Sequence, residues 1–290
     1  MRMMTSQNTL YRKVGWAALI GVVCLTVYVM NTRKDGAYVY MTLPQLSSGG
    51  QVRELLDVKH CPVPGLASIE QYRTYLHHTE TACKNMRQFG GHPPAPRDGR
   101  KFVCMDQRFN IKPGNCTIFS FGVNNEWSFE DEMEKFGCKV YAFDPTMGKE
   151  DHRRSPGIQF FATGIANYQG VKKIGMGKNW EMRKVDRFEN MVNQVGETDN
   201  EIDFIKLDVE LSEVDFLQDM LLNSQHVLHN IKQIAMEVHD DTFKGDLSQT
   251  SRQQVFWPYF MLMRCHDFRL IQSRDAGRWR EVVWAREVKW

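Results

Sequence analysis

The chain has 290 residues, of which 42% are hydrophobic and 25% are charged, and its formal net charge at pH 7 is +2. This length and composition allow a substantial core in one large domain with appendages, or in two small ones. The near-neutral charge, without a long run of lysine or arginine, argues against nucleic acid as a partner.

The first predicted element is an uncharged segment at residues 14–30. Its length of about 17 residues is the lower limit for a helix that crosses a bilayer. Arg2, Arg12 and Lys13 precede it, a slight bias that favours a cytoplasmic N-terminus. We interpret it as an uncleaved signal anchor and not as a cleaved signal peptide, because no small-x-small site follows it. The prediction is a single-pass type II membrane protein of the Golgi or endoplasmic reticulum, with residues 1–13 cytoplasmic and the body lumenal.

Residues 31–100 are predicted to form a stem, a helical segment and a linker before a catalytic domain at residues 101–290. Helical patterns cover residues 51–59 and 66–89, and the glycine- and proline-rich residues 90–99 are typical of a linker. Residues 102–106 are predicted to be a strand or a sheet edge.

Six cysteines lie outside the predicted anchor: Cys61, Cys83, Cys104, Cys116, Cys138 and Cys265. An even number in the secretory pathway permits up to three disulfides, with the connectivity left open, and we predict at least one. No Cys-x-x-Cys pair indicates zinc. Asn115 begins an Asn-x-Thr sequon, so it is a glycosylation candidate if this segment is lumenal.

The catalytic domain is organised around residues 117–133. An apolar run at residues 117–121 predicts a buried parallel strand, and at Gly122 the pattern changes to that of a helix. Such a glycine turn presents backbone N–H groups and a helix N-terminus to a ligand. The next predicted strand ends at Asp144, where an acid can bind ribose hydroxyls. The pair predicts a site for a nucleoside-bearing cofactor.

Strands and helices continue to alternate towards the C-terminus. We predict strands at residues 158–162, 202–210 and 231–239, a short hairpin at 171–174, helices at 179–195, 213–222 and 254–266, and a closing strand pair at 268–272 and 281–285. This rhythm predicts an α/β, Rossmann-like fold with a doubly wound, mostly parallel sheet. The closing antiparallel hairpin is the arrangement of class I methyltransferases.

Polar residues end several of these strands and should converge on one crevice at the carboxyl edge of the sheet. They are Asn124, Asn125, Asp144, Asp208, Glu210, Glu237 and His239.

Four motifs together resemble the metazoan methyltransferase-like proteins related to the FkbM group. They are Ser120-Phe-Gly-Val-Asn-Asn-Glu-Trp-Ser-Phe129, Val140-Tyr-Ala-Phe-Asp-Pro145, Ile205-Lys-Leu-Asp-Val-Glu210 and Met236-Glu-Val-His239. The resemblance covers Cys104 to the C-terminus and implies an S-adenosylmethionine-dependent O-methyltransferase, since several relatives act on sugar hydroxyls. One departure is that the usual Asp-x-Glu-Gly-Ala-Glu becomes Asp208-Val-Glu-Leu-Ser-Glu213 here.

We expect the cofactor to contact residues from the glycine turn, the second and third strand ends and the fourth strand. These are Phe121, Gly122, Val123, Asn124, Asn125, Trp127, Asp144, Pro145, Gly164, Ile165 and Asp208.

The catalytic candidates are His239, Asp208, Glu210 and Glu237. His239 is the first choice for a general base, because an imidazole pKa of about 6.5 suits that role; the alternative is a strand-end histidine that caps a loop. Asp208 is the second choice. Glu210 and Glu237 either orient the base, bind a divalent metal with Asp208, or satisfy backbone donors. Carboxylates suit Mg²⁺ or Mn²⁺, but no spacing rule favours a metal here.

The function predicted from these observations is methylation of a sugar hydroxyl on glycans. Five aromatic residues near the acceptor side are candidates for stacking on sugar rings: Trp180, Phe243, Trp257, Tyr259 and Trp279. One alternative is a Golgi glycosyltransferase, although the chain has no Asp-x-Asp motif. The other is a non-catalytic lumenal binding protein that keeps the fold.

Overall fold

The computed structural model describes residues 28–30, 38–40, 61–91, 99–176, 179–209, 212–239, 249–276 and 279–290. The predicted tail at residues 1–13, most of the predicted anchor and the predicted helix at residues 51–59 lie outside these ranges. Tyr28–Met30, at the end of the predicted anchor, forms strand β1, which pairs with β2 (Tyr38–Tyr40). Within the described residues, no helix is both long and apolar enough to cross a membrane.

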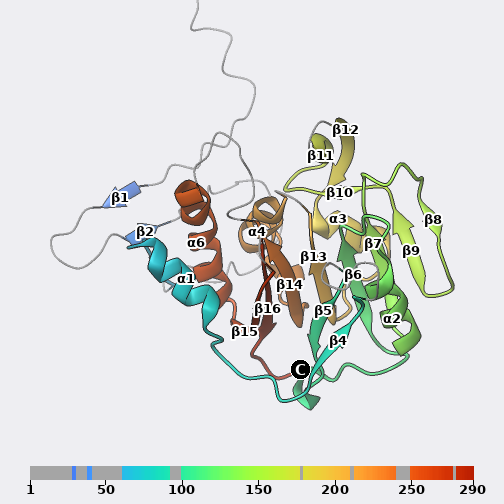
Figure 1. Cartoon of the computed structure of the whole chain (residues 1–290), viewed down its shortest axis with the longest axis horizontal. Coiled ribbons are helices and arrows are strands. Elements are labelled where there is room, and N and C mark those ends of the chain that lie inside the picture. The colour runs from blue at the N-terminus through green and yellow to red at the C-terminus, as the bar shows by residue number, and fades with distance from the viewer. Residues whose placement is uncertain are drawn as a thin grey trace, which may run out of the picture.

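An eight-stranded sheet forms the centre of the described structure (Figure 1). Its order is β15 (Phe268–Asp275), β16 (Arg280–Arg286), β14 (Gln233–Val238), β13 (Phe204–Leu207), β6 (Thr117–Phe121), β7 (Lys139–Phe143), β9 (Ile158–Phe161) and β8 (His152–Arg153). Neighbours from β14 to β9 are parallel, whereas β16 is antiparallel to both β14 and β15. The predicted mostly parallel sheet with a closing hairpin is therefore confirmed.

The central strands form because their residues suit burial on both faces. Every residue of β6, β13 and β14 is buried, as continuous apolar runs in a parallel sheet should be. The residues that interrupt these apolar runs are polar but also buried, such as Ser120, Lys206 and Glu237, and they form hydrogen bonds inside the protein.

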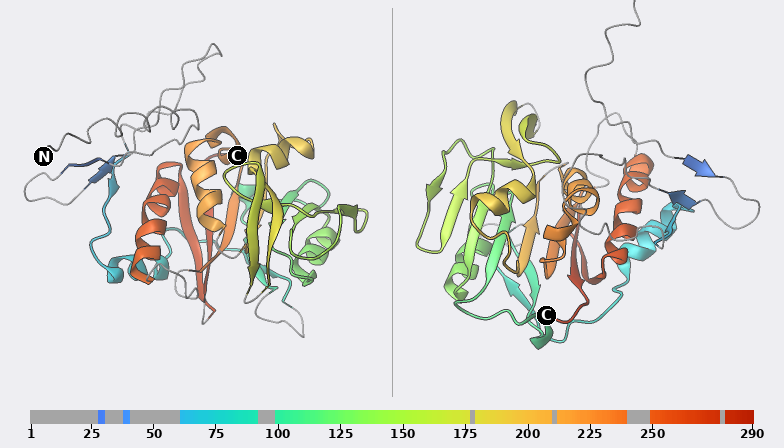
Figure 2. Two further views of the ribbon diagram at one scale, coloured as in Figure 1. Left: turned by 90° about the horizontal axis from the view of Figure 1, so that it is seen from above. Right: turned by 180° about the vertical axis from the view of Figure 1, so that it is seen from behind.

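Two hydrophobic clusters cover the two faces of the sheet. One contains residues of α1 (Ile69–His77), α3 (Phe188–Gln194), α4 (Glu213–Leu222), α5 (Gln225–Leu228) and α6 (Gln249–Cys265). The other contains residues of α2 (Ser128–Phe136), of the two-stranded sheet β4 (Met86–Phe89) and β5 (Lys101–Cys104), and of the short helix η2 (Gln107–Phe109). Figure 2 shows the sheet between these layers from two further sides.

The helix predicted at residues 179–195 is only partly correct. Asn179–Asp186 forms strand β12, which pairs antiparallel with β11 (Gly170–Met176) and, at its end, parallel with β10 (Gly164–Ile165). The helix, α3, begins only at Phe188. Trp180 and Met182 are exposed and Val185 is buried, a pattern that fits both periods over a short stretch. Pairing with β11 decided the conformation, and local spacing could not reveal that partner.

The helix predicted at residues 66–89 is also too long. Helix α1 ends at His77, and Met86–Phe89 is strand β4, which pairs antiparallel with β5. The carboxylate of Asp106 accepts hydrogen bonds from the backbone N–H groups of Lys84 and Asn85, at 3.1 and 2.8 Å, which draws the chain into extended pairing. The strand predicted at residues 102–106 is confirmed as β5.

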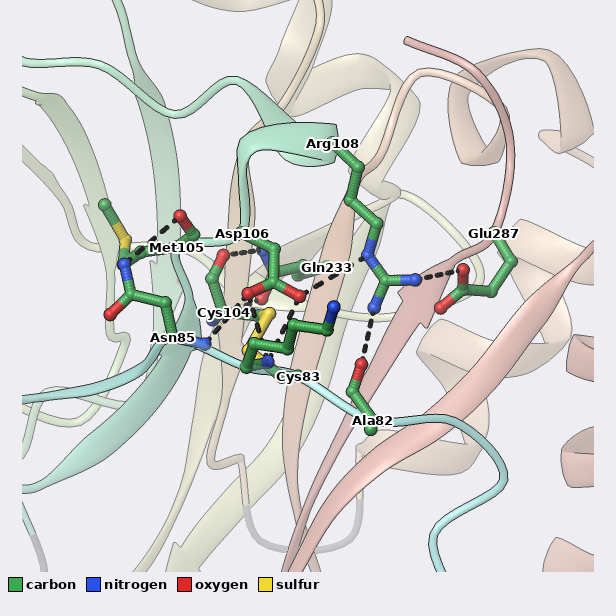
Figure 3. Close-up of a disulfide and its surroundings, with 10 residues drawn as sticks. Ala82, Cys83, Asn85, Cys104, Met105, Asp106, Arg108, Gln233 and Glu287 are labelled. Atoms are coloured by element: carbon green, nitrogen blue, oxygen red, sulfur yellow. Dashed lines mark hydrogen bonds and ion pairs between the residues drawn. A yellow bond between two sulfur atoms is a disulfide. The ribbon is translucent and has the colours of Figure 1, made fainter.

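The six cysteines lie at disulfide distance in three pairs. The Cα–Cα distances are 6.0 Å for Cys61–Cys265, 5.9 Å for Cys83–Cys104 and 4.7 Å for Cys116–Cys138. The second pair joins the segment before β4 to the end of β5 (Figure 3), and the third joins the starts of β6 and β7. Asn115 is exposed beside Cys116. These distances support the prediction of at least one disulfide, and they show which cysteines are paired, a point that the sequence left open.

Candidate active site

A cavity of about 700 Å³ lies at the carboxyl ends of the parallel strands. It brings together most of the residues predicted from the sequence. Its lining includes Phe121, Gly122, Val123, Asn124, Asp144, Pro145, Gly164, Ile165, Asp208, Glu237 and His239. Convergence of these strand ends follows from the parallel sheet.

Three predicted site residues are not placed in this cavity. Asn125 is in the adjoining turn but does not line it. Trp127 packs instead against Phe160, with ring centroids 5.9 Å apart, and carries the Arg154 guanidinium over its ring. Glu210 lies outside the described residues.

Gly122 is required by a close approach between two strands. Its φ of +78° is in the left-handed region, and a Cβ added there would lie 1.6 Å from the carbonyl oxygen of Asp208. The next turn residues, Asn124 and Asn125, also have positive φ values, of 46° and 60°. The glycine therefore lets the loop after β6 lie directly against the end of β13.

Asp144 organises this loop. Its Oδ2 accepts hydrogen bonds from the backbone N–H groups of Val123 and Asn124, at 2.9 and 2.8 Å. Its Oδ1 accepts from the Thr146 N–H at 2.8 Å and from the Thr146 hydroxyl at 2.6 Å. The sequence predicted a ribose ligand at this position. The structure adds a second role, and ribose hydroxyls would have to share or replace the contacts from Thr146.

Lys206 is a cavity residue that sequence reasoning missed. Its buried ammonium donates to the carbonyl oxygen of Gly122 at 2.6 Å and lies 3.3 Å from Glu130 Oε1. The hydroxyl of Ser120 donates to the same Glu130 oxygen at 2.5 Å. The available signal was a lysine inside an otherwise apolar strand, which must have a partner when buried.

A second buried lysine, Lys101 of β5, lies at the acidic end of the cavity. Its Nζ is 2.5 Å from Glu237 Oε1, 3.3 Å from Glu281 Oε1 and 3.9 Å from Asp208 Oδ2. Burial lowers the pKa of this ammonium, but the three carboxylates outweigh burial and raise it above its usual value. Lys101 is therefore a cation throughout the physiological range.

Glu237 titrates in an unusual range. Burial raises the pKa of its carboxyl to about 7, with a further contribution from Asp208, although Lys101 opposes the shift. Glu237 is also the register partner of Glu281 across β14 and β16, and like charges in such pairs repel. Lys101 contacts both carboxylates and offsets that repulsion, and Arg274 also pairs with Glu281.

His239 is fixed by a carboxylate that the sequence reading did not assign. Its Nδ1 lies 2.6 Å from Glu213 Oε1, and both side chains are buried. The contact assigns the Nδ1 hydrogen to the Glu213 side of the ring, which makes Nε2 the basic nitrogen. Nε2 lies 3.9 Å from Glu237 Oε2, and His239 lines the cavity. The signal for Glu213 was its place as the last acid of the fourth-strand motif.

The β11–β12 hairpin forms one wall of the cavity. The short hairpin predicted at residues 171–174 lies within β11, but the second strand, β12, was predicted to be a helix. Ile174, Glu181 and Arg183 line the cavity from this hairpin. Lys172 fastens the hairpin to the start of α4, since its Nζ lies 2.9 Å from Ser212 Oγ and 2.7 Å from Asp215 Oδ2.

Of the four aromatic candidates that the structure describes, one lines the cavity. Trp279 does so, with its ring centroid 6.3 Å from that of His239. Trp257 is buried and donates to the carbonyl oxygen of Pro64, and Tyr259 packs against the core. Trp180 is exposed on the hairpin, and Phe243 lies outside the described residues.

The acidic end of the cavity also holds three side chains whose ligand atoms are close enough together to bind a metal ion. Each of Asp208, Glu237 and His239 presents one ligand atom, and these three atoms lie within 4.8 Å of one another. Lys101 already contacts the two carboxylates of this group.

Comparisons with known proteins identify the family of the chain. Residues 57–262 match a family model described as "Methyltransferase domain". The human "Probable methyltransferase-like protein 24" is 25% identical over 211 residues, which are 70% of this chain and 56% of that protein. The rat protein of the same name is 25% identical over 214 residues, with the same shares. The chain thus spans about half the length of these curated relatives.

Among solved structures, M. capricolum TrmK in complex with S-adenosyl-homocysteine has a TM-score of 0.30 and 11% sequence identity, over 63% of this chain and 68% of that one. A similarity this low adds no argument about the site. The family match covers most of the chain, and it confirms the predicted relation to the methyltransferase-like proteins. The chain belongs to the family described as "Methyltransferase domain".

Proposed function

We propose that this methyltransferase transfers a methyl group from S-adenosylmethionine to a hydroxyl group of a glycan in the lumen of the secretory pathway. The single observation that carries the proposal is the buried Glu213–His239 pair at the cavity beside Trp279. A fixed imidazole next to an indole face suits deprotonation of a sugar hydroxyl and packing of a sugar ring.

The donor side of the cavity fits S-adenosylmethionine. The loop at Gly122 lines this side of the cavity, so its backbone can contact a bound ligand. Helix α2 begins directly after this loop, and the positive end of its dipole lies at the same side of the cavity. Pro145 and Gly164 pack against each other in the cavity wall, where a Cβ on the glycine would be 2.9 Å from Pro145 Cγ. Ile165 and Ile174 add apolar walls that suit a planar base. When bound, S-adenosylmethionine supplies an electrophilic methyl group and leaves as S-adenosylhomocysteine.

On the acceptor side, the residues of this chain hold the hydroxyl and take its proton. His239 Nε2 accepts the proton of the attacking hydroxyl while the new oxygen–carbon bond forms and the carbon–sulfur bond breaks. Glu213 holds the ring orientation and stabilises the protonated imidazole through Nδ1. Asp208 and Glu237 offer oxygens at the cavity wall that can accept hydrogen bonds from neighbouring hydroxyls.

The secretory setting is proposed from the sequence and supported by the cysteines. The uncharged segment at residues 14–30 and the flanking basic residues favour a signal anchor. Three cysteine pairs at disulfide distance suit an oxidising compartment. The family match favours a methyltransferase over the glycosyltransferase alternative.

The test of the reaction uses labelled S-adenosylmethionine with panels of glycans, proteins and lipids, read by mass spectrometry. The expected product is a methyl ether on a sugar, formed by the His239→Ala variant on the order of a hundredfold more slowly than by the wild-type chain. Efficient methylation of a protein side chain or lipid, without methylation of any glycan, would contradict the assignment of a glycan as the acceptor. No binding of S-adenosylmethionine would favour the non-catalytic alternative.

The test of the setting is protease protection of intact microsomes. The body should resist digestion until detergent is added. Digestion without detergent would contradict a lumenal location.

A further inference from the structure

Lys101 reaches the active site from outside the main sheet and ends among carboxylates of three strands or strand ends. Its ammonium contacts Glu237 of β14, Glu281 of β16 and, at 3.9 Å, Asp208 after β13. The side chains of Lys101, Glu237 and Glu281 are at most 3% exposed, and that of Asp208 is 19% exposed. Asp208 and Glu237 line the cavity, so the lysine lies behind its acidic wall.

The position of this lysine is fixed by the way β5 is attached to β14. At one end of β5, the side chain of Gln233 accepts from the Cys104 N–H and donates to the Cys104 carbonyl, both at 2.8 Å. At the other end, Lys101 binds Glu237, which is four residues along the same strand and therefore on the same face. The Cys83–Cys104 pair ties the same Cys104 end of β5 to the segment before β4 (Figure 3). The strand is thus held in one register above the sheet.

Without this lysine, the same wall would offer a metal the ligands it prefers. Two carboxylates and an imidazole, from Asp208, Glu237 and His239, present atoms within 4.8 Å of one another. Such oxygen and nitrogen ligands suit Mn²⁺ or Mg²⁺, and the Nδ1 contact of His239 with Glu213 is the kind of outer partner that orients a metal-bound imidazole. The ammonium of Lys101 contacts both carboxylates of the group, so it supplies their positive partner and repels a second cation.

We propose that Lys101 is a built-in cation that holds the carboxylates of Asp208 and Glu237 in place at the acceptor wall, so that this site works without a divalent metal. Lys101 touches neither the donor nor the acceptor side of the cavity, so it is a positioning residue. The inference rests on the proposed function for its role in methyl transfer. The exclusion of a divalent ion from the wall can be measured without any reaction.

The experiment is titration of the wild-type chain and its variants with Mn²⁺, followed by the electron paramagnetic resonance signal of the free ion. The wild type should show no binding up to about 1 mM Mn²⁺. Lys101→Met should bind Mn²⁺ at least tenfold more tightly, because two carboxylates then lack their cation. The double variant Lys101→Met with Glu237→Gln should lose the acquired binding.

Lys206→Met is the matched control, since it removes another buried lysine of the same cavity whose partners are Glu130 and Gly122. It should behave as the wild type does towards Mn²⁺. A merely structural lysine would give no gain of metal binding on removal, so equal binding by wild type and Lys101→Met would overturn the proposal.

If Lys101→Met fails to fold, the wild-type titration decides alone. Binding of Mn²⁺ with a dissociation constant below about 1 mM would overturn the proposal, and absence of binding at about 1 mM would support it. A parallel titration of the same wild-type sample with S-adenosylmethionine keeps the two questions separate. Absence of S-adenosylmethionine binding would contradict the proposed function, whereas Mn²⁺ binding would contradict only the role of Lys101.

Discussion

His239 Nδ1 lies 2.6 Å from Glu213 Oε1, and the two side chains are 3% and 1% exposed. The residues come from different elements, the end of β14 and the first turn of α4, and meet only in the folded chain. A buried imidazole with one nitrogen held by a carboxylate has a defined orientation at the cavity, which is what a general base needs. This contact argues against the alternative in which His239 only caps a loop.

The first prediction concerns this pair. His239→Ala should lower kcat for the methylated acceptor by on the order of a hundredfold or more, because the proton acceptor is lost. Glu213→Gln should lower kcat by about tenfold, since it keeps a side chain of the same shape but removes the charge that stabilises the imidazolium. Initial rates with labelled S-adenosylmethionine measure both effects. Wild-type rates in His239→Ala, with the fold intact by circular dichroism, would remove His239 from the mechanism.

The second prediction concerns the donor site. Asp144→Ala should weaken S-adenosylmethionine binding at least tenfold, or by about 1.4 kcal/mol, because the amides of Val123 and Asn124 lose their acceptor and the ribose loses its acid. Calorimetry measures the affinity. Asp131→Ala, an exposed acid on α2 that pairs with Arg154, is the control and should bind as the wild type does. Unchanged affinity in Asp144→Ala would disprove the assignment.

The third prediction compares two glycines with the same φ angle. Gly122 and Gly114 both have φ of +78°, but a Cβ at Gly114 meets nothing within 4 Å, whereas one at Gly122 would meet the Asp208 carbonyl at 1.6 Å. Gly114→Ala should cost only about 1 kcal/mol, from the left-handed conformation. Gly122→Ala should cost about 3 kcal/mol or more, because β6 and β13 must separate. Chemical denaturation of both variants checks this, and equal losses would contradict the close approach.

The fourth prediction concerns pH and two histidines that directly follow helices α5 and α6. His266 Nδ1 lies 3.1 Å from His229 Nε2, and burial, together with His229 and Arg286, lowers the pKa of His266 to about 4. In the unfolded chain this pKa is about 6.5, so the unfolded state binds the proton first as the pH falls. This histidine therefore contributes stability above pH 6.5 that is lost as the pH falls towards 4, by about 2–3 kcal/mol.

His266→Gln should flatten this pH dependence of the unfolding free energy. His226→Gln, which removes an exposed histidine, is the control and should leave the dependence as in the wild type. Urea denaturation between pH 4 and pH 8 measures both. Parallel curves for wild type and His266→Gln would show that His266 does not carry the effect.

The sequence by itself determined the features that depend on local pattern. Apolar β-branched and aromatic runs predicted β6, β7, β13 and β14, and the switch of period at Gly122 predicted the turn into α2. Because parallel strands present their carboxyl ends at one edge, the polar residues that follow them were correctly expected to converge. Gly122, Asp144, Asp208 and His239 could therefore be placed without a structure.

Only the tertiary structure decided the contacts that depend on register and on distant partners. Residues 179–186 became a strand because β11 offered a partner, although their spacing also fits a helix. Lys101 and Glu237 are 136 residues apart, and their contact requires both the attachment of β5 to β14 and the pairing of β14 with β16. Such contacts are set by long-range packing, which local periodicity does not encode. The acidic residues of the site could therefore be predicted from the sequence, whereas their pairing with Lys101 could not.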